Sequence, residues 1–263
     1  MALTNLFYSG NGTTQVDSGL PRVGVIHGIN ANGDLLFYRY QGHGEPDCSG
    51  NLNWDPNSSN PIGNGFQGFS TLLGCGDGVI LGIDQNGDLR WYKYDGNGES
   101  DITGTLGFHP NSGNPIGNGF QGFLKVFVTP REGRFNSSRL TIYGIAQNGD
   151  LHWYSYDGNG ESDITGVLGW HPNSGNVIGN GWQNFLHVFG SGGDIFAIQK
   201  NGDLHWYSYH GNGESDPSGS LGWDPRSGNP IGNGFQNFRA VFGGANDTNG
   251  FHRVLFAVQQ NGD

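Results

Sequence analysis

Cysteine and long apolar runs are scarce in this chain. Its 263 residues include two cysteines, Cys48 and Cys75. Each occupies a slot that other residues fill in the repeats described below, so a repeating disulfide framework is excluded and free thiols are expected. No run approaches the roughly 18 apolar residues that a membrane-spanning helix needs, so no membrane insertion is expected.

Basic residues are also few, with 12 lysines and arginines against 23 acidic residues and a formal net charge of −11. Binding to nucleic acid or to anionic lipids needs lysines and arginines that displace the counterions of the phosphate groups. The excess of acidic residues therefore argues against both partners. The first residues, MALTNLFYSG, lack both a basic segment and a sustained apolar run. We therefore expect no signal peptide, and a protein that is cytoplasmic or released by a non-classical route.

Glycine and aromatic residues are abundant instead. The chain contains 50 glycines, and aromatic residues make up 13% of it. Disordered chains lack aromatic residues and collagen-like chains place glycine at every third position, so neither class fits. Glycines at turns between aromatic-rich strands indicate an all-β protein.

One segment is repeated four times along the chain. Each copy runs from an Asn-Gly-Asp turn to a phenylalanine, over the cassettes 32–69, 86–123, 148–185 and 201–238. The turn glycine and the last phenylalanine are 36 positions apart in every copy. A period above about 40 residues with four strand-like segments is typical of a propeller. We predict a single β-propeller domain over residues 1–263, with five four-stranded antiparallel blades.

Four strands are expected in each repeat, and in the best-marked copy they cover Leu186–Phe189, Ile195–Gln199, Leu204–Tyr209 and the region around Ser220–Trp223. The Asn-Gly-Asp between the second and third strands is expected to form a two-residue hairpin turn of the primed type, where glycine supplies the positive φ. Insertions at Thr129–Arg139 and Gly243–Arg253 fall between the first and second strands. This variable connection is expected to face solvent.

The two ends of the chain are expected to form the closing unit, residues 239–263 with 1–31. Leu6–Ser9 resembles the third strand of a repeat, and the chain stops at Asp263, where such a strand would begin. We predict that the N- and C-terminal strands pair and close the ring without an open edge. The alternative takes Leu6–Ser9 as the first strand of blade one, with the chain truncated or its ring completed by a partner. The oligomeric state stays open.

A Gly-rich acidic loop recurs in each cassette. The alternating oxygens from Asp95 to Asp101 suit calcium, but the leading Asp becomes Gln41 and His210 elsewhere and no bidentate Glu follows. The carboxylates either cap N–H groups of their own turns or accept hydrogen bonds from ligand hydroxyls. We predict the second of these roles, with ligand hydroxyls as the donors, for Glu45, Asp47, Glu99, Asp101, Glu161, Asp163, Glu214 and Asp216.

No catalytic pattern emerges from the sequence. A glycosidase needs carboxylates that converge on one site, which in a propeller is the central channel, and the innermost strands such as Leu186–Phe189 contain no acid. No Ser-His-Asp, phosphate-loop or zinc-finger pattern occurs, and the nine histidines show no ligand spacing. We predict a protein that is not an enzyme and that holds neither a metal nor a cofactor.

Two aromatic slots beside glycine turns are the strongest candidates for a ligand site. One slot holds Trp54, Phe108, Trp170 and Trp223, and the other holds Phe66, Phe120, Trp182 and Phe235. A flat ring beside exposed backbone N–H groups and an Asn amide suits a sugar, whose apolar face stacks on the ring. The other repeated aromatics are expected in the core: Phe69, Phe123, Phe185, Phe238, Trp91, Trp153 and Trp206.

The combined motif Ile-Gly-x-Gly-[Trp/Phe]-x-x-Phe, an apolar strand pair and Asn-Gly-Asp-Leu-x-Trp-Tyr resembles the tachylectin-type β-propeller lectins over Val23–Asp263. It is also similar to fungal propeller lectins that bind terminal N-acetylglucosamine. The resemblance implies one sugar site per blade interface, with the glycine-aromatic turn as its wall. Three of the four turns have Phe where the family tends to have Trp, and the long acidic loop departs from the horseshoe-crab members. The turn glycines are Gly65, Gly119, Gly181 and Gly234.

We therefore expect a non-catalytic, multivalent lectin that binds glycans with terminal N-acetylglucosamine at about four inter-blade sites. Trp54, Trp170 and Trp223 are expected to stack on or flank the sugar. The acetamido group is expected to be held by Asn64, Asn118, Asn180 and Asn233 with adjacent backbone. The rival from another class is a protein-binding scaffold that uses the inserted loops near Arg131–Phe135 and Asn246–Phe251, and a glycosidase is the weaker rival.

Overall fold

The computed structural model describes residues 3–10, 24–41, 49, 52–129, 140–246 and 253–260. The chain divides into two compact units, and each is described by itself. Unit 1 comprises Met1–Gly117 and Gly160–Ile164, and unit 2 comprises Asn118–Asn159 and Thr165–Asp263. Among the described residues no helix has the length and apolar character needed to cross a membrane.

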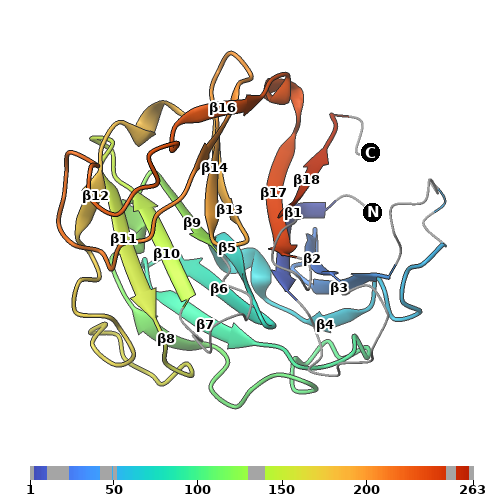
Figure 1. Ribbon diagram of the computed structural model, residues 1–263. Helices are drawn as coiled ribbons and strands as arrows, with labels where there is room; N and C mark the ends of the chain where they lie inside the picture. Colours follow the sequence, from blue (N-terminus) through green and yellow to red (C-terminus); the bar gives the residue numbers. More distant parts are fainter. Residues whose placement is uncertain are drawn as a thin grey trace, which may run out of the picture. The chain divides into compact units, whose positions relative to one another are not determined.

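Unit 1 contains two four-stranded antiparallel sheets in which the strands follow one another in chain order (Figure 1). The first strands of the two sheets, β1 and β5, contact each other. The first sheet is β1 (Leu3–Gly10), β2 (Gly24–Asn30), β3 (Leu35–Tyr40) and β4 (Pro61–Gly63). The second is β5 (Phe69–Gly76), β6 (Val79–Asp84), β7 (Leu89–Lys93) and β8 (Asn114–Gly117).

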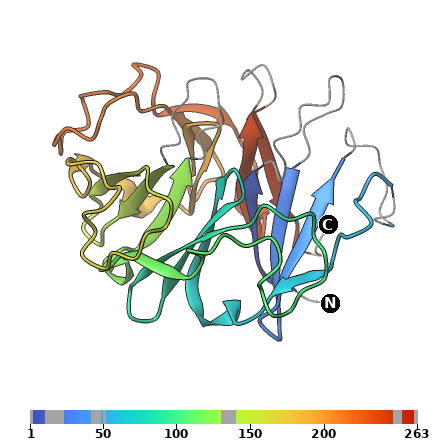
Figure 2. The same ribbon diagram turned by 90° about the horizontal axis from the view of Figure 1, so that it is seen from below.

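Unit 2 contains two further sheets of the same order and a two-stranded sheet (Figure 2). The four-stranded sheets are β9 (Lys125–Thr129), β10 (Leu140–Ile145), β11 (Leu151–Tyr156), β12 (Val177–Gly179), and β13 (His187–Ser191), β14 (Asp194–Ile198), β15 (Leu204–Tyr207), β16 (Asn229–Gly232). The two-stranded sheet is β17 (Ala240–Asn246) with β18 (Arg253–Val258). The prediction of an all-β protein built from repeated four-stranded antiparallel sheets is confirmed.

The first strands of neighbouring sheets in unit 2 approach each other through glycines. A Cβ atom on Gly190 would overlap the carbonyl oxygen of Val128, and one on Gly243 would overlap the carbonyl oxygen of Gly190. A side chain at either position would force these first strands apart. The glycines therefore set how closely the sheets of this unit pack.

The position predicted for the fourth strand was wrong. Trp223 makes only an isolated bridge with Tyr209, and the fourth strand is β16. The backbone before Trp223 has other partners, because the N–H groups of Ser220 and Leu221 donate to the Asp216 carboxylate. The real fourth strands carry Pro-Ile-Gly or Val-Ile-Gly at the sheet edge, where proline is tolerated.

The Asn-Gly-Asp turns also differ from the predicted type. Gly33 has a φ of 85°, but the non-glycine residues with positive φ in the described part of the chain are Asn53, Ser59 and Asp77, and none of them belongs to these turns. The Gly33 N–H donates to the Asn30 carbonyl at 3.0 Å, and the Asn30 N–H donates to the Asp34 carbonyl at 3.2 Å. This is a three-residue loop that ends in a left-handed glycine, rather than a primed two-residue turn.

The N-terminal strand does not pair as predicted. Strand β1 pairs with β2 and occupies the first position of its sheet, as β5, β9 and β13 do in theirs. The predicted pairing of the N- and C-terminal strands was therefore wrong, and the alternative assignment of Leu6–Ser9 to the first strand of a blade is correct. Pairing with the neighbouring strand closes a short loop and so costs less chain entropy than pairing with the far end.

The core of each unit lies between its sheets. In unit 1 a buried cluster includes Phe7, Phe37 and Ile80, and in unit 2 one includes Tyr143, Trp153 and Ile195. Of the predicted core aromatics, Trp91 and Trp153 are buried. The others are partly buried: Phe69, Phe123, Phe185, Phe238 and Trp206.

Several predictions fall outside the described residues. These include Cys48 and the acids Glu45 and Asp47. The insertion after Thr129 does begin between a first and a second strand, as expected, but residues 130–139 and 247–252 are not described. Cys75 is a buried free cysteine, and burial raises the pKa of its thiol.

Candidate functional site

A glycine-aromatic turn follows the fourth strand of each four-stranded sheet. Strand β4 ends at Gly63, and Asn64 and Gly65 then lead into the 3-10 turn η1 (Phe66–Gly68). Gly65 has a φ of 91°, a left-handed conformation that a residue with a Cβ adopts only with strain. The same turn is found at η2 (Phe120–Gly122), η3 (Trp182–Asn184) and η4 (Phe235–Asn237), after Gly119, Gly181 and Gly234.

Hydrogen bonds tie this turn to the Asn-Gly-Asp turn at the start of the same cassette. The Phe66 N–H donates to the Gly33 carbonyl at 3.0 Å, and Asn64 Nδ2 donates to Asp34 Oδ1 at 2.6 Å. A Cβ atom on Gly33 would overlap the amide of Gln67. The beginning and the end of the cassette thus meet in space, which gives its constant 36-position span a physical reason.

The same tie occurs in unit 2, where the predicted acetamido ligands Asn180 and Asn233 donate to Asp150 and Asp203 at 2.6 and 2.5 Å. These hydrogen bonds lower the pKa of both carboxyl groups below the ordinary value. One amide N–H of each Asn is therefore engaged by the turn itself. Asn118 holds the corresponding position after β8.

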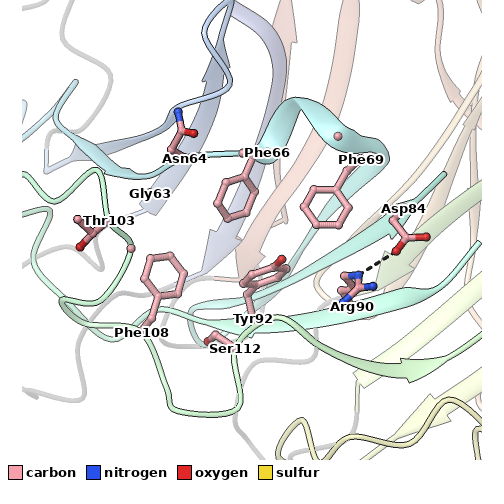
Figure 3. Close-up of a pocket in the computed structure, with 13 residues that line it drawn as sticks. Gly63, Asn64, Phe66, Phe69, Asp84, Arg90, Tyr92, Thr103, Phe108 and Ser112 are labelled. Carbon is pink, nitrogen blue, oxygen red and sulfur yellow. Dashed lines mark hydrogen bonds and ion pairs between the residues drawn. The ribbon is translucent and has the colours of Figure 1, made fainter. Parts of the chain in front are cut away.

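In unit 1 the turn forms one side of a pocket of about 360 Å³ (Figure 3). The rings of Phe66, Tyr92 and Phe108 form its aromatic part, with ring centroids 5.2 Å apart for Phe66 and Tyr92 and 6.4 Å apart for Tyr92 and Phe108. Thr103 lies at one end of this row of side chains in Figure 3, and the Arg90–Asp84 ion pair lies at the other. Pockets of this size suit a small organic ligand.

The two predicted aromatic slots come together here, but with unequal exposure. Phe66 is 5% exposed and packs against Phe69 and Tyr92, whereas Phe108 is half-buried. Phe120 and Trp182 are likewise 5% exposed. The turn aromatics therefore act mainly as packing, and the aromatic of the other slot offers the more accessible ring.

Unit 2 repeats the arrangement of three rings twice. Phe120 lies 5.2 Å from Tyr154 and 6.3 Å from Trp170. The second group is more tightly stacked, with Trp182 at 4.6 Å from Tyr207 and at 5.8 Å from Trp223, where the two indoles are 28° from parallel. In each group the turn aromatic of one cassette lies beside the second-slot aromatic of the next cassette.

Individual indole groups differ in what they bond. Trp223 Nε1 donates to the Ile178 carbonyl at 2.9 Å, whereas Trp182 Nε1 makes no hydrogen bond within the described residues. The two remaining predicted aromatics pack locally. Trp54 lies against Tyr38 and Tyr40, and Phe235 lies against Phe238.

Asp101 and Asp216 are saturated by their own loops. Asp101 accepts five hydrogen bonds, from the N–H and Oγ1 of both Thr103 and Thr105 and from the N–H of Leu106. Asp216 accepts the equivalent five from Ser218, Ser220 and Leu221. A carboxylate has about four lone-pair positions, so this arrangement is the capping alternative rather than recognition of sugar hydroxyls. These bonds hold the pKa of both carboxyl groups well below its usual range.

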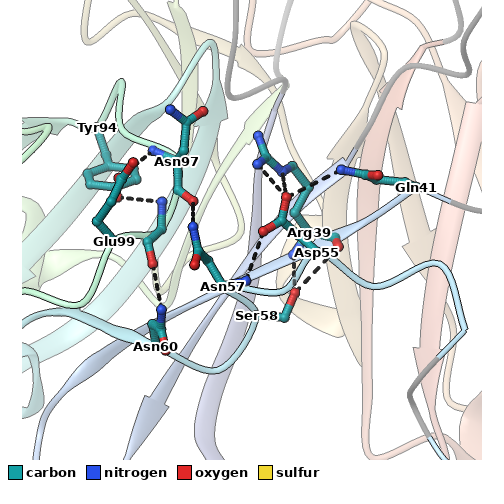
Figure 4. Close-up of polar contacts among 10 residues, drawn as sticks. Arg39, Gln41, Asp55, Asn57, Ser58, Asn60, Tyr94, Asn97 and Glu99 are labelled. Atoms are coloured by element: carbon teal, nitrogen blue, oxygen red, sulfur yellow. Dashed lines mark hydrogen bonds and ion pairs between the residues drawn. The ribbon is translucent and has the colours of Figure 1, made fainter.

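The glutamates of the loops have a similar local role. Glu99 accepts a hydrogen bond from the Asn97 N–H at 3.0 Å, and Glu214 accepts one from the Asn212 N–H at 2.9 Å. Figure 4 shows that the loop containing Glu99 is also held by side chains that precede β4, since Asn57 and Asn60 donate to the carbonyls of Asn97 and Gly98. In the cassette 148–185 the acids of the loop are Glu161 and Asp163. The Asp163 N–H donates to the carbonyl of Pro115, a residue of the preceding cassette.

The calcium alternative finds no supporting cluster. In the described ranges no group of three or more His, Cys, Asp or Glu side chains is placed to hold a metal ion. What the acidic loop does in unit 1 is to position Thr103 and Gly104, which follow the capping Asp101 and line the pocket.

Sequence reasoning missed the tyrosines and the ion pair of the pocket. Tyr92, Tyr154 and Tyr207 follow the tryptophan of the Leu-x-Trp-Tyr strand, so they point to the opposite face from the buried Trp91 and its equivalents. That alternation was available in the sequence. Asp84 and Arg90 carried no such signal because neither residue recurs at the corresponding positions in the other copies.

A family model described as Tachylectin matches residues 28–263, which is most of the chain. The chain belongs to the tachylectin family. The repeated motif predicted this membership, and the interpretation as a tachylectin-type β-propeller lectin is confirmed. No curated protein matches this tachylectin-family chain significantly.

Solved structures add more distant similarities. A variant of the Aleuria aurantia lectin in complex with α-methyl-L-fucoside is 16% identical at a TM-score of 0.45, over 97% of this chain and 88% of that one. Prp20p from Saccharomyces cerevisiae is 12% identical at a TM-score of 0.37, over 94% and 54% of the two chains. A GH62 hydrolase in complex with xylotriose is 12% identical at a TM-score of 0.35, over 88% and 70%. At these scores the likenesses carry no conclusion about the tachylectin-family chain.

Proposed function

We propose that this protein is a multivalent lectin that binds terminal N-acetylglucosamine non-covalently. The observation that carries the proposal is the group of three rings beside a left-handed glycine turn, present once in unit 1 and twice in unit 2. The apolar face of the sugar stacks on the accessible ring, which is Phe108, Trp170 or Trp223.

The polar groups of the turn supply hydrogen-bonding capacity beside that ring. In unit 1 Asn64, Gly65 and Thr103 line the pocket. Gly65 has nothing within 4 Å of the position of a Cβ atom, so its backbone is open to a ligand. The acetamido group lies against this turn in the proposal, because it offers one donor and one acceptor to backbone and amide groups.

Repetition of the ring group is the proposed mechanism of useful affinity. A single small sugar site is weak, but several sites that engage one glycosylated surface raise the avidity by roughly 10²–10⁴. The blade number we propose is five, since β17 and β18 pair as the first two strands of the other sheets do, and Asn261-Gly262-Asp263 follows as in the repeats.

Calorimetric titration with N-acetylglucosamine tests the proposal. We expect about three equivalent or graded sites per chain, with galactose as a control that lacks the acetamido group. Replacement of Trp223 by alanine should remove one site, whereas Trp206→Phe, outside the ring groups, should leave the number of sites unchanged.

The outcomes separate sugar specificity from lectin activity. Absence of binding to every glycan on an array that includes N-acetylglucosamine termini would refute the lectin proposal. Preference for fucose, the sugar in the Aleuria structure, would refute the N-acetylglucosamine specificity and keep the lectin activity.

A further inference from the structure

The pocket of unit 1 has a charged end that is missing beside the ring groups of unit 2. Asp84 comes from the end of β6 and Arg90 from β7, and Arg90 Nε donates to Asp84 Oδ2 at 2.8 Å (Figure 3). Both side chains line the same pocket as Phe66 and Phe108. The side chain of Arg90 is 32% exposed and that of Asp84 is 16% exposed, so both can reach a ligand in the pocket.

The pair keeps unused hydrogen-bonding capacity. Arg90 uses Nε for Asp84 and Nη1 for the Gly113 carbonyl at 3.0 Å. Its Nη2 lies 3.7 Å from an Asp88 oxygen, which is too far for a hydrogen bond. Asp84 Oδ1 accepts from the N–H groups of Asn86 and Asp88, while Oδ2 accepts from Arg90 alone within the described ranges. A donor and an acceptor therefore stand side by side.

Unit 2 has no such pair at the corresponding positions. Ala146 and His152 stand there in one copy, and Gln199 and His205 in the other. His152 Nδ1 lies 2.8 Å from the Gly175 carbonyl oxygen, and His205 Nδ1 lies 2.7 Å from that of Gly228. These glycines correspond to Gly113, so each histidine makes the contact that Arg90 makes in unit 1. Only the unit 1 pocket, within the part of the chain that the structure describes, combines a carboxylate with a guanidinium.

The charge of the group indicates which ligand it suits. One arginine with Asp84 and Asp88 gives a local charge of about −1, which repels an anionic substituent. A carboxylate beside a guanidinium matches the vicinal hydroxyl groups of a neutral sugar, because each hydroxyl can donate to Asp84 Oδ2 or accept from Arg90 Nη2.

We propose that Asp84 and Arg90 form a second subsite that binds the vicinal hydroxyls of a neutral sugar residue linked to the terminal N-acetylglucosamine. This inference rests on the proposed function of the pocket. The repeated sites are then unequal: the unit 1 pocket binds a disaccharide, and the ring groups of unit 2 bind only the terminal sugar.

The test uses residue pairs that the chain itself contains. The double variant Asp84→Ala with Arg90→His reproduces the pair Ala146 and His152, and Asp84→Gln with Arg90→His reproduces Gln199 and His205. Calorimetry compares N-acetylglucosamine with a neutral disaccharide, N-acetylglucosamine linked β1-2 to mannose, whose mannose keeps vicinal hydroxyls at C3 and C4, for the wild type and both variants. Sugar binding at the unchanged ring groups of unit 2 in each variant shows that the chain is folded.

We expect one site per wild-type chain to prefer the disaccharide by at least about fivefold, as one or two additional hydrogen bonds allow. Both variants should lose this preferring site while the unit 2 sites keep their affinities. The reciprocal variant, Ala146→Asp with His152→Arg, should gain a second site that prefers the disaccharide.

Three results would overturn the subsite. They are an equal preference in wild type and variants, no disaccharide preference in the wild type, and tighter binding of a disaccharide whose second residue is a uronic acid. If the wild type binds neither sugar, the proposed function itself fails, and this result differs from all three.

Discussion

Replacement of His27 by leucine should stabilise unit 1, and the stabilisation should grow in acid. His27 lies on β2 with an exposure of 0%, packed among the rings of Phe7, Phe37 and Tyr94. Neither of its ring nitrogens has a hydrogen-bond partner in the described part of the chain. The corresponding position in β6 is Leu81, which is also 0% exposed, so leucine is already compatible with this site in the fold.

The magnitude follows from the proton affinity of the buried ring. Burial lowers the pKa of His27 from 6.5 to about 4, and the nearby Leu36 backbone offsets only part of this effect. Because the folded protein binds the proton more weakly than the unfolded chain, stability is lost as pH falls below 6.5. At 1.36 kcal/mol per pKa unit, the loss reaches about 2 kcal/mol at pH 5 and levels off at about 3 kcal/mol below pH 4.

The pH-independent part of the effect adds to this. Removing two buried polar atoms without partners should stabilise unit 1 by about 1–3 kcal/mol even at pH 8. Leucine should therefore raise the free energy of unfolding at pH 8, and should raise it by about 2 kcal/mol more at pH 5.

Urea unfolding of both proteins at pH 8 and pH 5 measures the two quantities. All other titrating groups are common to wild type and variant, so they cancel in the difference between the two pH values. If the two proteins lose the same stability between pH 8 and pH 5, His27 does not remain neutral in the folded state and the reasoning is refuted. A destabilised variant at pH 8 would show that the ring nitrogens are satisfied.

Three further predictions concern local contacts. Gly82→Ala should destabilise unit 1 by about 1–3 kcal/mol in urea unfolding, because its Cβ would lie 2.6 Å from the Phe69 ring, whereas Gly68→Ala, with nothing within 4 Å, should be tolerated. Asp101→Asn should speed amide exchange at Leu106, because the Leu106 N–H donates to the Asp101 carboxylate. The hydrogen bonds of the loop lower the pKa of Asp101 in the folded protein, so exchange at Leu106 in the wild type should also speed up as pH falls below about 4. The Asn variant should show no such pH dependence. Trp223→Phe removes the hydrogen bond from Nε1 to the Ile178 carbonyl in β12, so the free energy of unfolding should fall by about 1 kcal/mol. An unchanged free energy of unfolding would contradict this contribution.

The repeated cassette made much of the fold predictable. Its fixed span, its alternating aromatic strands and its left-handed glycines identify the all-β class, most strand positions and the tachylectin family without a structure. The residues of the two aromatic slots were also identified from their equal spacing in the cassettes. These features are local or periodic, so a linear pattern carries them.

The roles of the acids were not predictable in the same way. Asp101 has the sequence features of a ligand-binding carboxylate and of a capping one, and only the positions of Thr103, Thr105 and Leu106 around it decide for capping. Similarly, Asn64 is engaged by Asp34, a residue 30 positions earlier. Which of two chemically suitable partners a side chain bonds is decided by distance in three dimensions.

The sequence by itself determined the repeat, its glycine turns, its aromatic slots and therefore the family, because each of these is written in residue identity and spacing. Only the tertiary structure decided that β1 pairs with β2, that the ends of each cassette are hydrogen-bonded to each other, and that Asp84 and Arg90 meet in the unit 1 pocket. Long-range pairing depends on which of several complementary partners comes within reach at the lower cost in chain entropy. The spacing of residues along the chain does not show which of these partners is bonded.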